Sequence, residues 1–488
     1  MNETTLQLGI VGGYLLLSLL VGLLAYRLTD RSAEDYYLAS RTLGTVVLLF
    51  TTFATLLSAF TFFGGPNLAY GSGPEWILVM GLMDGVLFAV LWYVVGYKQW
   101  LLGREHGYVT LGEMLGDRFG SPLLRGLIAG ISLFWLFPYV MLQQVGAGTA
   151  LEALTGGELS YAMGAGLVTV FMIAYVVLAG MRGIAWTDTL QGAFMLVMVW
   201  AAVLWVLAEL GGMSSATATL AESNPEFLSL GGGVYSPQWM LSQAIGIAFG
   251  VAMFPQVNQR FFVAGSKKVL KRTFSLWPIM VVLLFVPAFM LGAWARGLPI
   301  DAADQNVLSV LLAEYAPAWF AALVVAGAMA AMMSSSDSML LSGSSYFTRD
   351  LYRPFVNPNA SDGWEDTLGR IGVAVFALAA FVASLYTPKA IVEIGSTAFG
   401  GFAQLALPVI VALYWSRVTR VGMYFGIVGS QVFYLASVFL PFVPGSYAGW
   451  LASVVGMVVG LVLTVSVSTV TSHAFNEETN LYFDLQAD

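Results

Sequence analysis

Long apolar runs separated by short polar segments dominate the chain. About thirteen of these runs reach roughly twenty residues, the length that an α-helix needs to cross a bilayer. They cover residues 6–26, 44–70, 74–97, 126–152, 160–180, 187–208, 237–257, 275–295, 318–346, 371–387, 389–414, 421–442 and 449–470. Backbone polar groups in lipid need internal partners, so spans of this length are helices and not barrel strands. The pattern predicts an all-α polytopic membrane protein with about 13 transmembrane helices.

Composition supports this class and excludes several functions. Hydrophobic residues make up 58% of the 488 residues, charged residues only 10%, and the net charge is −8. A soluble domain carries about 25% charged residues. The chain has no cysteine and only two histidines, His106 and His473, which argues against disulfides, thiolate metal sites and histidine-based zinc or haem sites. We also find no P-loop motif and no basic nucleic-acid footprint, and we expect neither an enzyme nor a nucleic-acid partner.

The basic residues predict an orientation. With thirteen spans, 18 of the 20 Lys and Arg residues fall in one set of loops, Arg260 among them, and only Arg296 and Lys389 fall in the other. Loops rich in Lys and Arg stay on the cytoplasmic side. The prediction is a multi-pass protein of the cell membrane with its N-terminus outside and residues 471–488 as a cytoplasmic tail.

One apolar span contains an unusual polar stretch, AMAAMMSSSDSMLL at residues 328–341. On a helix, Ala331, Ser334, Ser335 and Ser338 share one face, and Asp337 borders it. Serines in membrane helices often serve close packing or bond back to their own backbone. That reading does not explain an aspartate, which costs about 2.5–3.5 kcal/mol at a helix centre. The stretch therefore favours an ion site over a purely structural role.

The residue types indicate which ion. Hydroxyl and carbonyl oxygens suit a small monovalent cation, because a divalent ion normally recruits several carboxylates. An unwound helix could supply free carbonyls, and two spans contain helix-breaking segments: FFGGPNLAYGSG in the second and GIAFGVAMFPQ in the seventh. Interrupted spans at matching places in two halves are typical of an inverted-repeat transporter, although glycine and proline are also common in ordinary membrane helices. This combination suggests sodium.

Five motifs in order give the chain a family resemblance: EDYYLASRTLG, ATLLSAFTFFGGPNLAYGSG, GMRGIAWTDTLQ, FPQVNQRFFVAGSKKVLKR and AGAMAAMMSSSDSMLLSGSSYFTRDLYR. With them the chain resembles the sodium:solute symporters, which include proline, pantothenate, monocarboxylate, sialic-acid and sugar cotransporters. The resemblance implies a LeuT-like five-plus-five inverted repeat. The leading helix would be 6–26, the repeats 44–208 and 237–414, and two extra helices would lie within 421–470.

The resemblance also implies cation ligands. The family's shared sodium site would take the carbonyls of Ala54, Leu57 and Ala331 and the hydroxyls of Ser334 and Ser335. Some members hold a second cation, which here would use the three residues Asp188, Asp337 and Ser338 together with the Ser334 hydroxyl. The chain departs from that pattern because Asp337 stands where a hydroxyl is usual. This leaves sodium, a proton or a simple hydrogen bond open at the second position.

The solute pocket is expected at the midplane, between the broken helices. Its predicted residues are Ser58, Thr61, Phe62, Tyr139, Gln143, Phe249 and Gln404, with Phe137, Phe254 and Phe399 as aromatic neighbours. No Arg or Lys lies in these spans, so an anionic group would rest on helix dipoles, hydroxyls and sodium. We expect a small carboxylate or an amino acid. A neutral solute such as a sugar, or a transporter-like sensor, remains an alternative.

Overall fold

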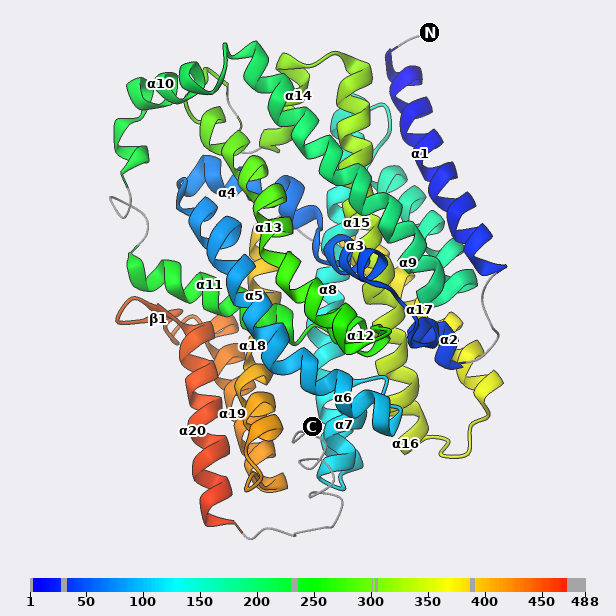
Figure 1. Ribbon diagram of the computed structural model, residues 1–488. Helices are drawn as coiled ribbons and strands as arrows, with labels where there is room; N and C mark the ends of the chain where they lie inside the picture. Colours follow the sequence, from blue (N-terminus) through cyan, green and yellow to red (C-terminus); the bar gives the residue numbers. More distant parts are fainter. Residues whose placement is uncertain are drawn as a thin grey trace.

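The computed structural model describes residues 3–27, 33–229, 236–300, 302, 306–386 and 391–471, and almost all of them are helical (Figure 1). Within these residues, eleven helices are long and apolar enough to cross a membrane, and two bent helix pairs raise the number of spans to 13. This confirms the predicted number of transmembrane helices. The predicted tail 471–488 lies outside the described residues apart from Thr471.

The spans follow the chain in order. They are α1 (Glu3–Tyr26); α3 (Thr45–Leu56), η2 (Phe60–Gly64) and α4 (Gly65–Ser72); η3 (Ile77–Met83), α5 (Asp84–Leu91), η4 (Trp92–Gly96) and α6 (Tyr97–His106); α8 (Pro122–Leu154); α9 (Tyr161–Glu209), which holds two spans; α11 (Pro237–Ala252) and α12 (Pro255–Val263); α13 (Lys267–Ala295); α15 (Ala318–Ser345) and η6 (Tyr346–Tyr352); α17 (Asp362–Ser384); α18 (Ile391–Tyr414); α19 (Arg420–Phe439); and α20 (Ala452–Val470).

Short elements lie between the spans, and all of them except β2, which falls at the start of the predicted span 449–470, fill segments that the sequence analysis left as loops. They are α2 (Ala33–Leu38), η1 (Ala39–Arg41), α7 (Leu111–Arg118), α10 (Met213–Ser223), η5 (Pro225–Leu228), α14 (Val307–Tyr315), α16 (Arg353–Phe355) and the two-residue strands β1 (Ser446–Tyr447) and β2 (Trp450–Leu451). Several spans also run past their predicted ends, as α13 does from Lys267 instead of residue 275. A span predicted from hydropathy ends at the first charged residues. The helix itself continues through them, because long charged side chains reach the water interface.

Both predicted irregular spans are broken. The second span bends by 60° between α3 and η2, and the seventh bends by 56° between α11 and α12. At the second break Phe254 is extended (φ −60°, ψ 130°) because proline at the next position disfavours the helical conformation. The first break lies at Leu57 (φ −85°, ψ 124°), seven residues before the glycines that marked it in the sequence. Pro66 instead lies in the first turn of α4, where proline is tolerated.

The fifth and sixth predicted spans form one bent helix, α9. Gly180 interrupts it with φ 55° and ψ −152°. A Cβ at this position would lie 2.4 Å from the side chain and 2.7 Å from the carbonyl oxygen of Tyr36, in α2. The site therefore requires glycine both for its backbone conformation and for its space.

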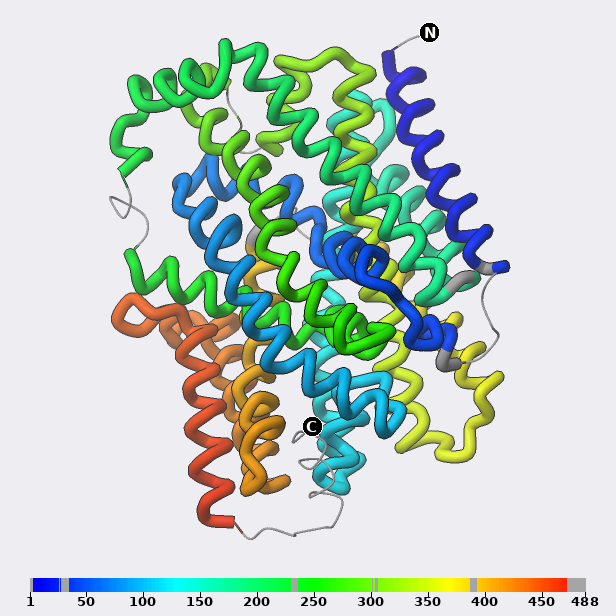
Figure 2. The backbone as a smooth tube through the Cα atoms, in the orientation of Figure 1, coloured from blue at the N-terminus to red at the C-terminus, as the bar shows by residue number. Residues whose placement is uncertain are grey.

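Helix α15 is the centre of the bundle. In its apolar window 83% of the residues are buried, against 28–72% for the other ten unbent spans. It packs against α3, α8 and α9, while α1 covers α9 and α15 from outside (Figures 1 and 2). Helices α19 and α20 pack together beside α18, away from α15. A polar stripe on α15 is thus enclosed by protein and not by lipid.

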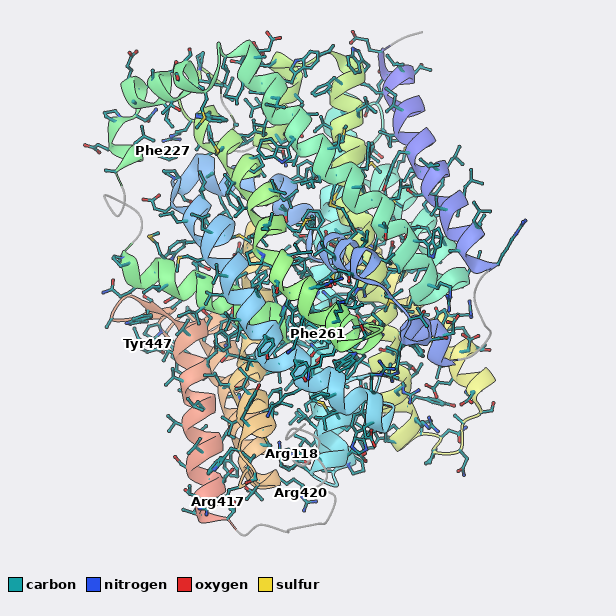
Figure 3. All side chains as sticks on the ribbon, viewed as in Figure 1. Arg118, Phe227, Phe261, Arg417, Arg420 and Tyr447 are labelled. Carbon is teal, nitrogen blue, oxygen red and sulfur yellow. The ribbon has the colours of Figure 1, made fainter. Side chains whose placement is uncertain are left out.

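Three basic residues of the predicted inner loops lie at one end of the molecule (Figure 3). Arg118, Arg417 and Arg420 lie at the end opposite α10 and α14 (Figure 3). The arrangement agrees with a single basic face, and the direction of that face in the cell stays a prediction.

Candidate functional site

The first group of interest surrounds Ser334. Because α3 ends at Leu56, its last carbonyls have no partner further along the helix. Ser334 Oγ lies 2.8 Å from the carbonyl oxygen of Ala54 in α3 and 3.0 Å from that of Ala331 in its own helix. All three residues are fully buried. A side-chain hydroxyl of α15 therefore meets an unused carbonyl of the broken helix.

Ser335 makes the matching contacts one residue later. Its Oγ lies 2.5 Å from the Leu57 carbonyl oxygen and 3.0 Å from that of Thr55. The Thr55 carbonyl was not among the predicted ligands, since only the position of the helix break brings it toward α15. The structure thus brings together all five residues of the predicted sodium site.

This oxygen group has the composition of a monovalent cation site. In the present arrangement both hydroxyls donate to carbonyls. A hydroxyl hydrogen rotates freely, and the oxygen keeps two lone pairs that accept or bind a cation. If their hydroxyl hydrogens rotated away from the carbonyls, Ser334 and Ser335 would offer two neutral oxygens beside the carbonyl oxygens. Small hard cations take oxygen ligands of this type. Among the described residues no carboxylate is hydrogen-bonded to Ser334 or Ser335, whereas the hydroxyl of Thr55 lies 3.5 Å from Asp188 Oδ2.

The second group, one turn further along α15, contains a full ion pair. Asp188 Oδ2 lies 2.6 Å from Thr51 Oγ1 and 3.2 Å from Arg260 Nη2. The same Nη2 donates to Ser338 Oγ at 2.5 Å. Asp188, Ser338 and Arg260 are at most 1% exposed. A guanidinium from α12 therefore lies between two of the predicted ligands of a second cation.

Arg260 is the functional candidate that the sequence analysis missed. Counting basic residues assigned it to an inner loop, because it follows the seventh span directly. In the structure α12 turns back into the protein after the break at Phe254, and it is buried along its whole length. A hint lay in FPQVNQRFFV, where three apolar residues, Phe261 to Val263, follow the arginine directly.

Asp337 has a different environment from Ser338. Its Oδ2 accepts a hydrogen bond from the hydroxyl of Tyr175 in α9, and within the described residues its other carboxylate oxygen has no partner. No hydrogen bond or ion pair links it to Asp188 or Arg260 in that same part of the chain. Asp337 thus has a hydrogen-bond partner of its own and shares none with Asp188 or Ser338.

The predicted solute residues divide into two sets. Ser58 lies 3.1 Å from the hydroxyl of Tyr139, and the Ala59 N–H donates to Gln143 Oε1 at 2.9 Å. Ser58, Thr61 and Tyr139 line a central cavity with room for about one water molecule (about 20 Å³ for the water centre). Side chains on α8 thus hold the break in the first core helix beside this cavity.

The remaining predicted residues lie elsewhere. Phe62 lines a separate small cavity with residues of α13, and Gln404 Nε2 donates to the carbonyl oxygens of Gly400 and Ser453 toward α20. Phe249 is half-buried, and neither it nor Gln404 lines the central cavity. Of the aromatic neighbours, Phe399 lines it and stacks on Phe254 at 5.6 Å between ring centroids, whereas Phe137 packs against Phe376.

Comparison with known proteins gives this geometry a family. The family model described as "Sodium:solute symporter family" matches residues 36–429. The chain belongs to the sodium:solute symporter family. It is 30% identical to the sodium/pantothenate symporter of Escherichia coli (strain K12) over 89% of this chain and 93% of that one. It is also 30% identical to the sodium/proline symporter of Haemophilus influenzae over 86% of this chain and 85% of that one.

A solved structure confirms the LeuT-like fold. It is a substrate-bound, outward-open Na⁺-coupled sialic acid symporter, which covers 96% of this chain and 98% of its own with a TM-score of 0.80 at 21% identity. The fold and the family membership identify a sodium-coupled solute symporter, which the sequence analysis predicted. The family and these relatives are transporters.

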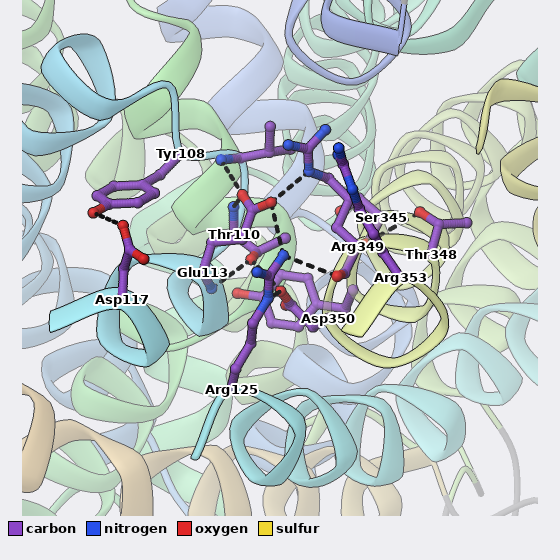
Figure 4. A network of polar contacts seen from close by, with 12 residues as sticks. Tyr108, Thr110, Glu113, Asp117, Arg125, Ser345, Thr348, Arg349, Asp350 and Arg353 are labelled. Atoms are coloured by element: carbon purple, nitrogen blue, oxygen red, sulfur yellow. Dashed lines mark hydrogen bonds and ion pairs between the residues drawn. The ribbon is translucent and has the colours of Figure 1, made fainter. Parts of the chain in front are cut away.

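A charged network joins α7, α8 and η6 at the basic end of this symporter (Figure 4). Thr110 and Glu113 form a capping box at the start of α7. Glu113 pairs with Arg125 of α8 at 2.9 Å and with Arg349 of η6 at 2.6 Å, and Arg125 also reaches Asp350 at 2.7 Å. Burial raises the pKa of Glu113, but the two guanidinium groups outweigh burial and hold the pKa below its ordinary value. Glu113 is therefore ionised at neutral pH, and the network ties α7 and α8 to η6 at the end of α15.

Proposed function

We propose that the protein imports a small organic solute that carries a carboxylate, together with a sodium ion bound by Ala54, Leu57, Ala331, Ser334 and Ser335. The observation that carries this proposal is the contact between the two serine hydroxyls and the carbonyls of the broken helix, at 2.5–3.0 Å. Pantothenate and proline, the solutes in the names of two relatives, both contain a carboxylate.

The geometry suggests how the ion and the solute are coupled. A sodium ion shared by α3 and α15 would hold the broken helix against the centre of the bundle. Ser58 follows Leu57 directly and contacts Tyr139 across the cavity. Ion binding at the carbonyls therefore fixes the wall of the solute pocket. An ion drives a conformational change only if it binds one state more tightly, and this site depends on how α3 lies against α15.

The ion pair of Asp188 and Arg260 favours a transport cycle with one sodium ion, because the guanidinium of Arg260 already supplies the positive charge beside Asp188. A second ion at Asp188 and Ser338 would require Arg260 to move away. Moving one positive charge across about 100 mV provides roughly 2.3 kcal/mol. With one sodium ion, the membrane potential drives the uptake of a neutral or zwitterionic solute. For a monoanion the two charges cancel, and the potential contributes nothing.

Uptake into proteoliposomes tests the proposal. Radiolabelled carboxylates, amino acids and sugars are offered with an inward sodium gradient and, in parallel, with choline in place of sodium. We expect sodium-dependent accumulation of at least one carboxylate-bearing solute. Accumulation of sugars alone would contradict the solute class, and accumulation that is equal in choline would contradict sodium coupling.

We further propose that the N-terminus faces outward in the cell membrane, on the basis of the charge distribution in the loops. The chain has no cysteine, so single cysteines give a clean signal. Exposed Ser214 in α10 and exposed Asn359 near α16 lie on opposite predicted sides. In intact cells an impermeant thiol reagent should label Ser214→Cys and not Asn359→Cys, and the reverse pattern would overturn the orientation.

A further inference from the structure

A third buried carboxylate, Asp84, has no role in the sites described so far. It begins α5, seven residues after the start of the span 77–106, and is 1% exposed. Within the described part of the chain, neither of its carboxylate oxygens has a hydrogen-bond partner. A carboxylate in an apolar interior is costly unless it is paired or neutralised.

The other buried aspartates of the described spans have partners. Asp188 pairs with Arg260, Asp337 accepts from Tyr175, and Asp350 pairs with Arg125. Asp84 differs from them because no side chain or backbone group of the described residues bonds to it. Partner groups for a buried polar atom come from the protein, from water or from a ligand. The carboxylate of Asp84 is therefore available to a ligand.

Asp84 lies on the face of its helix that borders the central cavity, although it is not itself among the residues that line the cavity. Met80 and Phe88 lie one turn before and one turn after it on the same face, and both line the central cavity. The turn that precedes Asp84 is the π-helical segment η3, and π-turns inside α-helices occur frequently at functional sites. Trp277 lines the same cavity, and its indole N–H also lacks a partner among the described residues.

Aromatic rings surround this side of the cavity. The ring centroid of Trp277 lies 4.4 Å from that of Trp92, 6.5 Å from that of Phe88 and 6.4 Å from that of Phe53. No Lys or Arg is among the residues that line the cavity. Faces of Trp, Tyr and Phe attract cations, and aromatic enclosures are a common means of recognising ammonium groups. A carboxylate beside such rings is complementary to a protonated amine.

We propose that Asp84 is the counter-charge for a protonated amine of the transported solute. This inference rests on the proposed function and narrows it, because the solute then carries an amine as well as a carboxylate. The central cavity has room for about one water molecule in this structure, so the solute would bind in a wider state of it, with the ammonium group between Asp84 and the rings of Phe88 and Trp277. The carboxylate would lie toward Ser58, Tyr139 and the sodium group.

Matched solute pairs test the inference. Alanine carries an amine where lactate carries a hydroxyl. Proline carries a ring amine where cyclopentanecarboxylate has a carbon. Sodium-driven uptake by the wild type should favour the amine member of each pair. Asp84→Asn should raise the half-saturating concentration for alanine or proline by about tenfold or more, since a buried charge partner is lost. It should leave the amine-free member unchanged.

Two controls separate failure of this inference from failure of the proposed function. Ser132→Ala removes another buried polar atom that has no partner among the described residues, and it should change nothing. Sodium-dependent thermal stabilisation of Asp84→Asn in detergent should match that of the wild type, which shows that the variant is folded and binds the ion.

Several outcomes would overturn the inference. One is that the wild type prefers the amine-free solutes, and another is that Asp84→Asn keeps the preference for amines. A third is that none of the four solutes is taken up by the wild type or changes its melting temperature. Loss of sodium dependence in the wild type would instead overturn the proposed function. Amine-selective thermal stabilisation that Asp84→Asn abolishes would still support Asp84 in that case.

Discussion

Two neighbouring parts of α15 present hydroxyls to the same broken helix, but they meet opposite electrostatic environments. Ser334 and Ser335 contact neutral carbonyls of α3. Ser338, one turn later, contacts Thr55 Oγ1 at 2.8 Å and the guanidinium of Arg260, which is paired with Asp188. The first part has oxygen ligands and no fixed cation, whereas the second already contains one. Similar hydroxyl spacing therefore serves two purposes, and the difference lies in what α12 contributes.

The largest effect is expected when the fixed cation is removed. Arg260→Gln leaves Asp188 buried beside Thr51 without its counter-charge, and breaking a buried pair costs about 3–5 kcal/mol. We expect a melting temperature in detergent well below that of the wild type. The double variant Asp188→Asn/Arg260→Gln removes both charges and should recover most of this loss.

The single variant also examines the second cation directly. If a sodium ion can replace the guanidinium, added sodium should stabilise Arg260→Gln more than it stabilises the wild type, because the ion then restores the counter-charge. Equal stability of the single and double variants would contradict the view that Arg260 neutralises Asp188.

The sequence predicted one of these two environments well and the other incompletely. Helical periodicity selected Ala331, Ser334 and Ser335, and the family motif supplied Ala54 and Leu57. The free carbonyls could not be derived from composition, because the helix breaks at Leu57, where neither glycine nor proline stands. Arg260 was misassigned because a basic residue after an apolar run normally marks a loop.

For the fold as well, the sequence predicts the features that depend on neighbouring residues and misses those that depend on contacts between distant segments. Span number and the two irregular spans follow from hydropathy and from glycine and proline placement. The burial of α12 depends on packing against α3 and α15, which are distant in sequence. Asp84 was visible as one acid within an apolar span, a feature that favours a functional role by default. Only the structure shows that its carboxylate lacks a partner among the described residues and that Met80 and Phe88, one turn to either side, line the central cavity.

The neutral part of the stripe is expected to respond more moderately. Ser334→Ala and Ser335→Ala each remove one ion ligand and leave the helix able to pack. We expect the sodium concentration for half-maximal uptake to rise by about tenfold, which corresponds to about 1.4 kcal/mol. Ser336→Ala is the matched control, because its hydroxyl is equally buried and has no partner among the described residues. Unaltered sodium dependence in both ligand variants would exclude this site.

The smallest effect is expected at Asp337, which borders both parts of the stripe and belongs to neither. Its hydrogen bond comes from Tyr175, and the amide oxygen of asparagine accepts the same bond. Asp337→Asn should therefore preserve the charge moved per solute and the steepness of the sodium response. Currents and solute uptake measured together in voltage-clamped proteoliposomes give both quantities.

Each alternative for Asp337 has its own signature in that experiment. A reduced ratio of charge to solute, or a shallower sodium response, would mean that Asp337 serves a second cation although no hydrogen bond joins it to Asp188 or Arg260 among the described residues. A wild-type pH dependence that Asp337→Asn abolishes would mean that the carboxyl carries a proton through the cycle. Tyr175→Phe sharpens the distinction. Loss of a structural hydrogen bond alters the melting temperature alone, whereas disturbance of a proton site alters the pH dependence of transport as well.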